Sequence, residues 1–259
     1  MMKSLPNKKD PVLVLGSKPD SMLPDIRPVH IYAANAAALK AKAYRELNPD
    51  VQLTCVVAGK TILEEYFQNV VREAEPNRLI TKNPCPYPLE ELFPEFRNNG
   101  VQTERMKRKD SYILQHSFFG RRAYWAEWLK LTSLSKIKNP NRAVRIVYNL
   151  LKEKYPTGAS SGLFCVIKAL TEYPGHPVVI SGVSLQGGGH FDQVDYFTSS
   201  RGKIDRYLCR SLPDHVKKDL FTVDSLMAKN GGIQLANLAP RWHNPSDHHR
   251  INKEKISIA

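Results

Sequence analysis

Several features that mark particular protein classes are missing from this chain of 259 residues. No run of about 18 apolar residues occurs, so no membrane-spanning helix is expected. The four cysteines are widely spaced and form no C-x-x-C pair, which argues against a metal site. Internal repeats, low-complexity tracts and a convincing D-x-D motif for a divalent cation are also absent. These absences disfavour integral membrane proteins, repeat proteins and zinc modules.

The start of the chain lacks the apolar core of a secretory signal, so we expect residues 1–10 to form a tail. Cys55 and Cys165 lie inside apolar runs, which indicates buried thiols in a reducing compartment. The expected location is therefore cytoplasmic.

Acidic residues are scarce relative to basic ones. The chain has 25 Asp and Glu against 38 Lys and Arg, a net charge of +13. Such a charge implies an acidic partner, for which nucleic acid, an anionic membrane surface, an acidic polysaccharide or a nucleotide would each serve. Charge alone does not choose among these partners.

Short apolar runs alternate with helical stretches along most of the chain. This alternation predicts an α/β fold with a Rossmann-like, doubly wound and mostly parallel sheet. We expect one domain over residues 11–240, followed by a basic C-terminal tail over residues 241–259. The predicted strands are residues 11–16, 30–34, 51–57, 79–80, 178–180 and 233–238. The predicted helices are residues 36–47, 61–75 (with Thr61 and Glu64 as a capping pair), 123–134, 143–154, 161–170 and 220–230.

The middle of the chain differs from the rest. It begins with a proline-rich stretch at residues 83–88, which cannot be helical, and continues through basic and aromatic segments. We interpret residues 83–142 as a helical, basic and aromatic insertion beside the sheet, carrying an acceptor site. The alternative is a solvated basic face over an aromatic core.

Small and hydroxyl residues open the helix predicted after residue 160. The free N–H groups and the dipole at such a helix start favour an anion such as phosphate, and Ser160, Ser161 and Gly162 lie there. Either serine could equally be a simple N-cap. Loops that follow parallel strands, such as residues 186–192, are the usual place for a ligand in open α/β sheets.

Five segments together resemble the bacterial sialyltransferases of the single-domain, Rossmann-like (GT-A-like) type, and more distantly transferases of other CMP-activated ulosonic acids such as Kdo. The family has a glycine loop after its first strand, an asparagine after its second, a T-S-G segment opening a helix, a strand ending in S-G, and a D-x-x-x-L helix before a last strand. The matching segments are residues 12–21, 31–35, 158–162, 179–184 and 224–240.

The resemblance implies metal-independent transfer of a sugar acid from its CMP-activated form to a glycan hydroxyl, with no cofactor beyond that donor, in polysaccharide biosynthesis for a bacterial cell surface. Departures from the family motifs put the identity of the donor sugar in doubt: Ser17, Lys18, Gly158 and Ser184 replace family residues, and the family tyrosines are missing. The residues expected to contact the donor are Gly16, Ser17 and Lys18 under the phosphate, Asn35, the trio Ser160, Ser161 and Gly162, and Ser184 and Gln186 after the later strand.

The acceptor hydroxyl needs a general base that titrates near neutral pH, which favours histidine. His215 is the first candidate because it precedes Asp219 and Asp224, either of which could match the family aspartate. His190 is the rival, and His116 is third.

Two other functions stay open. One is a double-displacement Kdo transferase in which Asp192 or Asp195 is the nucleophile. The other is a nucleic-acid-binding protein that uses the basic cluster at residues 105–109 with nearby aromatic side chains. The excess positive charge would suit an anionic donor, an anionic glycan acceptor or docking at the inner membrane.

Overall fold

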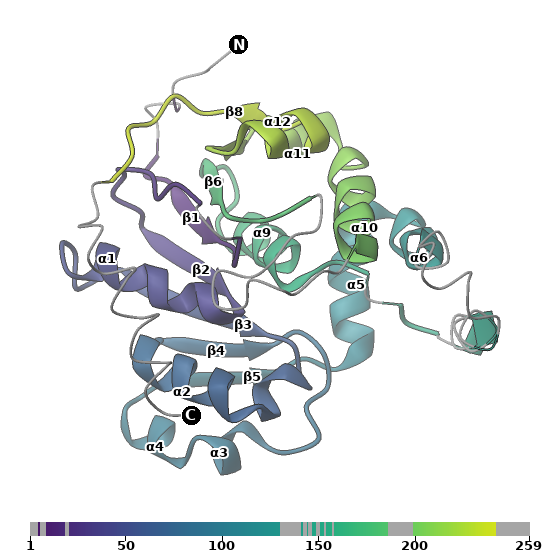
Figure 1. The fold of residues 1–259 in the computed structure, drawn as a ribbon. Coiled ribbons are helices and arrows are strands. Elements are labelled where there is room, and N and C mark those ends of the chain that lie inside the picture. Colours follow the sequence, from purple (N-terminus) through teal and green to yellow (C-terminus); the bar gives the residue numbers. More distant parts are fainter. Residues whose placement is uncertain are drawn as a thin grey trace.

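An eight-stranded, wholly parallel sheet forms the centre of the protein (Figure 1). The computed structural model describes residues 5, 9–18, 21–129, 141, 144, 147–148, 151–152, 154–156, 158–185 and 199–241. The strands are β1 Val12–Leu15, β2 His30–Ala34, β3 Gln52–Val57, β4 Arg78–Thr81, β5 Gln102–Arg105, β6 Val178–Ser181, β7 Leu220–Thr222 and β8 Gln234–Leu235.

The strand order is β5-β4-β3-β2-β1-β6-β7-β8, so β1 lies in the middle. From β1 the chain builds outward strand by strand to β5, returns to place β6 on the other side of β1, and then builds outward again. The order of the strands therefore reverses between β1 and β6. The predicted α/β, doubly wound arrangement is confirmed at this level.

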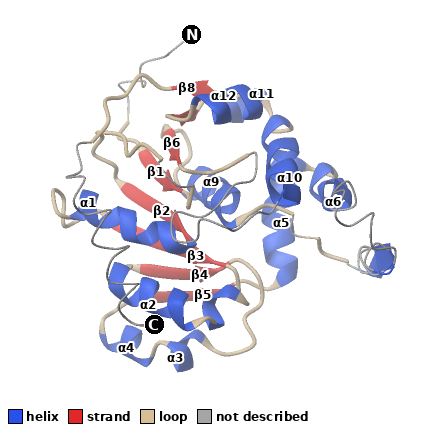
Figure 2. Cartoon of the chain, viewed as in Figure 1, coloured by secondary structure: helices blue, strands red, loops and turns tan. Residues whose placement is uncertain are grey.

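The central strands are buried on both faces, which explains why they appear in the sequence as unbroken apolar runs. Alternate residues point to opposite sides: Val12 and Val14 belong to one core, Leu13 and Leu15 to the other. Figure 2 shows helices on both faces of the sheet. The first core is covered by α5 Arg108–Phe119, α6 Arg122–Trp128, α9 Ser161–Glu172, α10 Ser199–Arg210 and α12 Ser225–Gly231, and the second by η1 Asn35–Ala41, α1 Lys42–Arg45, η2 Thr61–Leu63, α2 Glu65–Ala74, α3 Leu89–Leu92 and α4 Pro94–Asn98.

Residues 220–230 do not form the single helix that their composition suggests. Leu220–Thr222 is strand β7, which is fully buried and pairs with β6, and α12 begins only at Ser225. Burial on both faces decides the outcome here, because the short apolar run is as compatible with a strand as with a helix.

The prediction that Thr61 and Glu64 form a capping pair is also wrong. Thr61–Leu63 is a separate 3-10 turn, and α2 starts after Glu64, which makes no side-chain cap.

The insertion contributes to the sheet as well as lying beside it. Residues 83–142 include β5, which pairs in parallel with β4 and forms one edge of the sheet. Only half of its residues are well exposed, and its composition of Gln, Thr, Glu and Arg hides the strand from hydrophobicity patterns. In the helix expected over residues 143–154, Val144 and Leu151 are exposed rather than turned inward.

A polar network lies at the end of the sheet where the strands begin. His30 bonds through Nε2 to Thr54 and through Nδ1 to the Tyr173 hydroxyl, both at 2.8 Å. Glu172 accepts from Tyr32 and Arg78. Arg78 also pairs with Glu104, and Lys168 pairs with Glu172 at 2.6 Å. These contacts fasten the C-terminal end of α9 to the starts of β2 and β4 and to β5.

We expect this network to make stability depend on pH through His30. Burial lowers the pKa of His30 to about 4, with Glu172 opposing and Arg78 assisting the shift. Because the unfolded histidine titrates near 6.5, the unfolded state takes up the proton first. The free energy of unfolding should therefore fall by about 3 kcal/mol between pH 6.5 and pH 4. Urea denaturation across this range measures the effect.

The matched variant is His30→Gln, which keeps a donor and an acceptor but has no charge to gain. Its free energy of unfolding should change less between pH 6.5 and 4.5. Partial burial works to raise the pKa of the neighbouring Glu172, but hydrogen bonds from Lys168 and Tyr32 and the charges of Lys168 and Arg78 hold this pKa below its ordinary value. Glu172 therefore loses its contribution to stability only at lower pH. An identical pH dependence in both proteins would rule out the role of His30.

Candidate functional site

The carboxyl ends of β1 and β6 form the point where the strand order reverses. In open α/β sheets ligands bind outside the carboxyl ends of the strands at such a point. The loops that follow β1, β2 and β6 and the first turn of α9 all come to this edge, because the strands are parallel and α9 runs back along them. This edge is the candidate site.

The loop after β1 is joined to the loop after β6 by backbone contacts. Gly16 N–H donates to the Ser181 carbonyl at 2.8 Å, and Lys18 N–H donates to the Gly182 carbonyl at 2.9 Å. A Cβ on Gly16 would collide with the backbone of Gly182, and Gly182 itself has a φ of +73°. Both glycines are therefore required by this close approach. The N–H groups of Gly16 and Lys18, which we expected to face a phosphate, are already in use.

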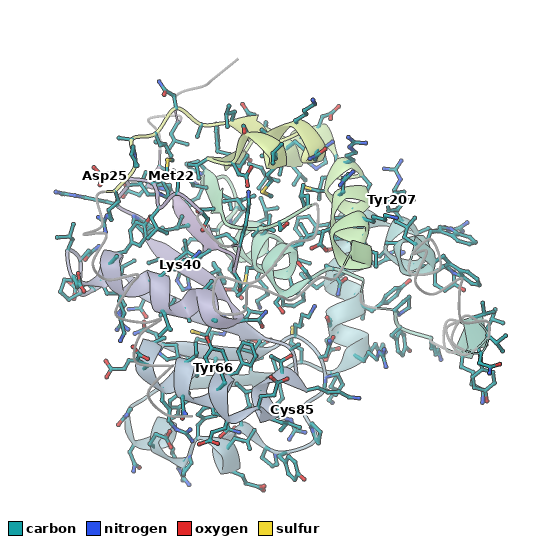
Figure 3. The ribbon with its side chains drawn as sticks, in the orientation of Figure 1. Met22, Asp25, Lys40, Tyr66, Cys85 and Tyr207 are labelled. Atoms are coloured by element: carbon teal, nitrogen blue, oxygen red, sulfur yellow. The ribbon has the colours of Figure 1, made fainter. Side chains whose placement is uncertain are left out.

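Side-chain hydrogen bonds also hold the loop after β1. The Ser17 hydroxyl donates to the Ala34 carbonyl at 3.0 Å, which links the ends of β1 and β2. Lys40 reaches from η1 to the Lys18 carbonyl at 3.0 Å and to the Ser21 hydroxyl at 2.6 Å (Figure 3). Residues 16–18 are thus held in place before any ligand arrives.

The Lys18 side chain pairs with Asp224, the N-cap of α12. Partial burial works to raise the pKa of Asp224, but hydrogen bonds from Lys18 and from the backbone of Met227 and Leu226 outweigh it and hold this pKa below its ordinary value. The carboxylate is therefore charged at neutral pH and compensates the Lys18 cation. The pair links the loop after β1 to the residue that follows β7 and caps α12.

Asn35 follows β2 in an unusual state. Its backbone has a φ of 51°, in the left-handed region, and its buried Oδ1 has no hydrogen-bond partner among the described residues. A buried amide oxygen without a donor is costly. The strain and the open acceptor at this position suit a residue that meets a ligand.

The first turn of α9 offers two backbone donors. Ser160 is the N-cap, and its hydroxyl accepts from Leu163 N–H at 3.2 Å. Within the part of the chain that the structure describes, the N–H groups of Ser161 and Gly162 meet no acceptor. Both residues are buried. Two unpaired N–H groups at the positive end of a helix of 12 residues form an anion-binding position.

Three buried side chains hold the segment that precedes α9. Asp205 of α10 accepts from Ser160 N–H at 2.9 Å, and Gln115 of α5 accepts from Ala159 N–H at 3.0 Å. Lys82, directly after β4, donates to the Ala159 carbonyl at 2.6 Å. Helix and strand ends that are distant in sequence thus converge on two consecutive residues. Lys82 also brings a positive charge close to the first turn of α9.

The structure does not bring His215 to this edge, which corrects the expectation from spacing. His215 lies on α11 Asp214–Lys217, which precedes β7 and so occupies the edge where strands begin. His116 is exposed on α5. Ser184 follows β6 and lies at the candidate site's edge. His190, Gln186, Asp192 and Asp195 lie outside the described residues.

Four residues that shape the site were not predicted from the sequence: Lys40, Lys82, Gln115 and Asp205. Lys82 carried a usable signal, because it lies two residues after the strand predicted at residues 79–80. Asp205 and Gln115 carried none, since their role depends on how α10 and α5 pack against α9.

Comparison of the chain with family models, curated proteins and solved structures finds no match. Within the described part of the chain no group of three or more His, Cys, Asp or Glu side chains could hold a metal ion. No helix among the same residues is long and apolar enough to cross a membrane.

We expect Asp205→Ala to lower the free energy of unfolding by about 1–3 kcal/mol, because the Ser160 N–H would lose its acceptor while staying partly buried. Asp205→Asn keeps an oxygen in the same place and should lose less. Equilibrium urea denaturation of the three proteins makes the comparison. An Asp205→Ala protein as stable as the parent would show that this bond does not hold the segment.

Proposed function

We propose that this chain is a glycosyltransferase that moves an ulosonic acid, such as sialic acid or Kdo, from its CMP-activated form to a glycan hydroxyl without a metal ion. The observation that carries the proposal is the pair of N–H groups of Ser161 and Gly162, which meet no acceptor among the described residues and open α9 beside the point where the strand order reverses. A phosphate of the donor fits this position by charge and by hydrogen bonding.

Transfer from a CMP-activated sugar builds negative charge on the departing phosphate. Donors and cations fixed in advance around that phosphate stabilise the transition state. The α9 dipole and the buried Lys82 would supply this field from one side of the crevice, and Lys18 and Lys40 from the other. Asp224 would share Lys18 with an incoming phosphate. Asn35 would contact the donor with its open acceptor.

The anionic acceptor would bind beside β5. Arg105 ends β5, and Lys107, Arg108 and Lys109 follow it; all four are exposed, at the same edge of the sheet as the candidate site. Their charge suits an acidic glycan of a bacterial cell surface. All four cysteines of the chain are buried and free, which suits a reducing cytoplasm.

The general base in this proposal is His190. It follows β6 in the sequence, and β6 ends at the candidate site, whereas His215 precedes β7 at the opposite edge. The nucleophilic alternatives Asp192 and Asp195 belong to the same connection.

We expect CMP to bind through the first turn of α9. Ser161→Pro removes one of the two donor N–H groups, yet proline is well tolerated at the first position of a helix. The preceding Ser160 already has the extended backbone that proline demands of its neighbour, with a ψ of 170°. The dissociation constant for CMP, measured by calorimetry, should rise roughly 10- to 100-fold, the effect of one charge-assisted hydrogen bond.

Ser161→Ala is the control, because it keeps the N–H group and should leave CMP affinity nearly unchanged. A parent protein that ignores CMP but binds RNA with a steep dependence on salt would refute the transferase proposal. Equal affinities in parent and Ser161→Pro would place the phosphate elsewhere.

We expect His190→Ala to slow transfer about 100- to 10,000-fold, the usual contribution of a general base, with CMP affinity preserved. His215→Ala should retain parental activity. Mass spectrometry of products from a panel of CMP-sugars and candidate acceptors measures both. If His215→Ala abolished transfer and His190→Ala did not, the general base would be His215, and the acceptor would have to bind at a different place.

A further inference from the structure

We propose that the outer side of α6 and of the helical residues that follow the insertion docks on a bilayer that contains anionic lipids. The proposal does not depend on the transfer reaction. It rests on an exposed apolar and aromatic surface, called here the insertion surface and made of Trp125, Val144, Tyr148 and Leu151, and on the positive charge around it.

The first part of this surface comes from α6. Ala123 and Ala126 are buried against the core, and Trp125 points the other way with 57% of its area exposed. Arg121 and Arg122 beside it are also exposed. An indole on the outside of a helix, flanked by arginines, is typical of segments that lie at a lipid–water interface.

The second part comes from helical residues just after the insertion, which ends at residue 142. Val144, Tyr148 and Leu151 have helical spacing, so they share one face, and they are 68%, 54% and 69% exposed. The Lys152 amine lies 4.2 Å from the centre of the Tyr148 ring. Figure 1 shows this helical segment beyond α6, at the outer side of the molecule. Isolated exposed apolar residues are ordinary in soluble proteins, but a stripe of three on one helix face is not.

The charge of the same region identifies the partner. Residues 121–154 hold nine Lys and Arg and two Glu, a net +7 out of +13 for the whole chain. Among them Arg121, Arg122, Lys152 and Lys154 are exposed. Basic residues near an anionic leaflet add about 1 kcal/mol each to the binding free energy. Apolar side chains add the free energy of burying their surface in the bilayer.

Other occupants fit less well. A symmetric contact with a second copy would place like charges against each other. Nucleic acid would use the basic side chains but would leave Val144 and Leu151 without a purpose.

The test uses the full chain and two kinds of vesicle, phosphatidylcholine alone and phosphatidylcholine mixed with phosphatidylglycerol. Sedimentation should show binding to the mixed vesicles only. Binding should weaken between ~0.1 M and ~1 M salt, because the screening length falls from about 10 Å to about 3 Å.

The Val144→Asp/Leu151→Asp variant should bind the mixed vesicles at least roughly 100-fold more weakly, because two inserted side chains are replaced by charges that the leaflet repels. Leu47→Asp/Leu226→Asp is the matched control: Leu47 follows α1 and is 74% exposed, Leu226 lies on α12 and is 48% exposed, and their replacement should have little effect. Trp125→Ser, on a different helix, should weaken binding about tenfold. Circular dichroism and urea midpoints check that each variant is folded.

Failure of the parent to bind mixed vesicles would overturn the proposal. So would equal losses in the insertion and control variants. A change of elution volume confined to the Val144→Asp/Leu151→Asp variant, without vesicle binding by the parent, would assign the surface to self-association. If the parent binds oligonucleotides but not vesicles, and the Val144→Asp/Leu151→Asp variant loses oligonucleotide binding, the insertion surface would be assigned to nucleic acid. None of these outcomes affects CMP affinity, so they are distinct from failure of the proposed transferase activity.

Discussion

The contact between Gly16 and Gly182 is the constraint on which the site depends. Two backbone segments approach so closely that neither position accommodates a side chain, and two N–H groups are used in bridging them. Since β1 and β6 are the strands between which the order reverses, this contact joins the loops that follow them at the candidate site. It uses the N–H groups of Gly16 and Lys18, so these two donors are not available to a ligand. Among the described residues, the N–H groups of Ser161 and Gly162 at the start of α9 meet no acceptor.

The open N–H groups at the start of α9 explain why several buried polar side chains converge there. A helix N-terminus with open donors is useful only if it is held still, because freedom lost on binding would reduce affinity. Asp205, Gln115 and Lys82 fix residues 159 and 160 from three different elements. At the other end of the same helix, Glu172 is bound to Tyr32, Arg78 and Lys168. Both ends of α9 are thus clamped by polar contacts, while its middle is packed in the core.

Much of the fold follows from patterns that the sequence shows directly. Strands buried on both faces, such as β1 and β6, are recognisable as apolar runs, and the alternation with helices indicates their parallel order. Other elements were harder: the edge strand β5 is polar, and Leu220–Thr222, between β6 and β8, has too few residues to separate strand from helix. The loop residues of the site were found by their place after strands. The roles of Gly16 and Ser17 were not, because strand-end glycine signals a close approach without telling whether a ligand or another backbone makes it.

His215 lies away from the candidate site for a related reason. Spacing to a downstream aspartate fixes a position along the chain but not the edge of the sheet, and a residue just before a strand lies a whole strand length from one just after it. Here β7 separates His215 from Asp224, which follows the strand and pairs with Lys18. In a parallel sheet, membership of the site therefore depends on whether a residue follows or precedes its strand. By that criterion Lys18, Asn35, Lys82, Ser184 and Asp224 belong together, although they are spread over more than 200 residues of sequence.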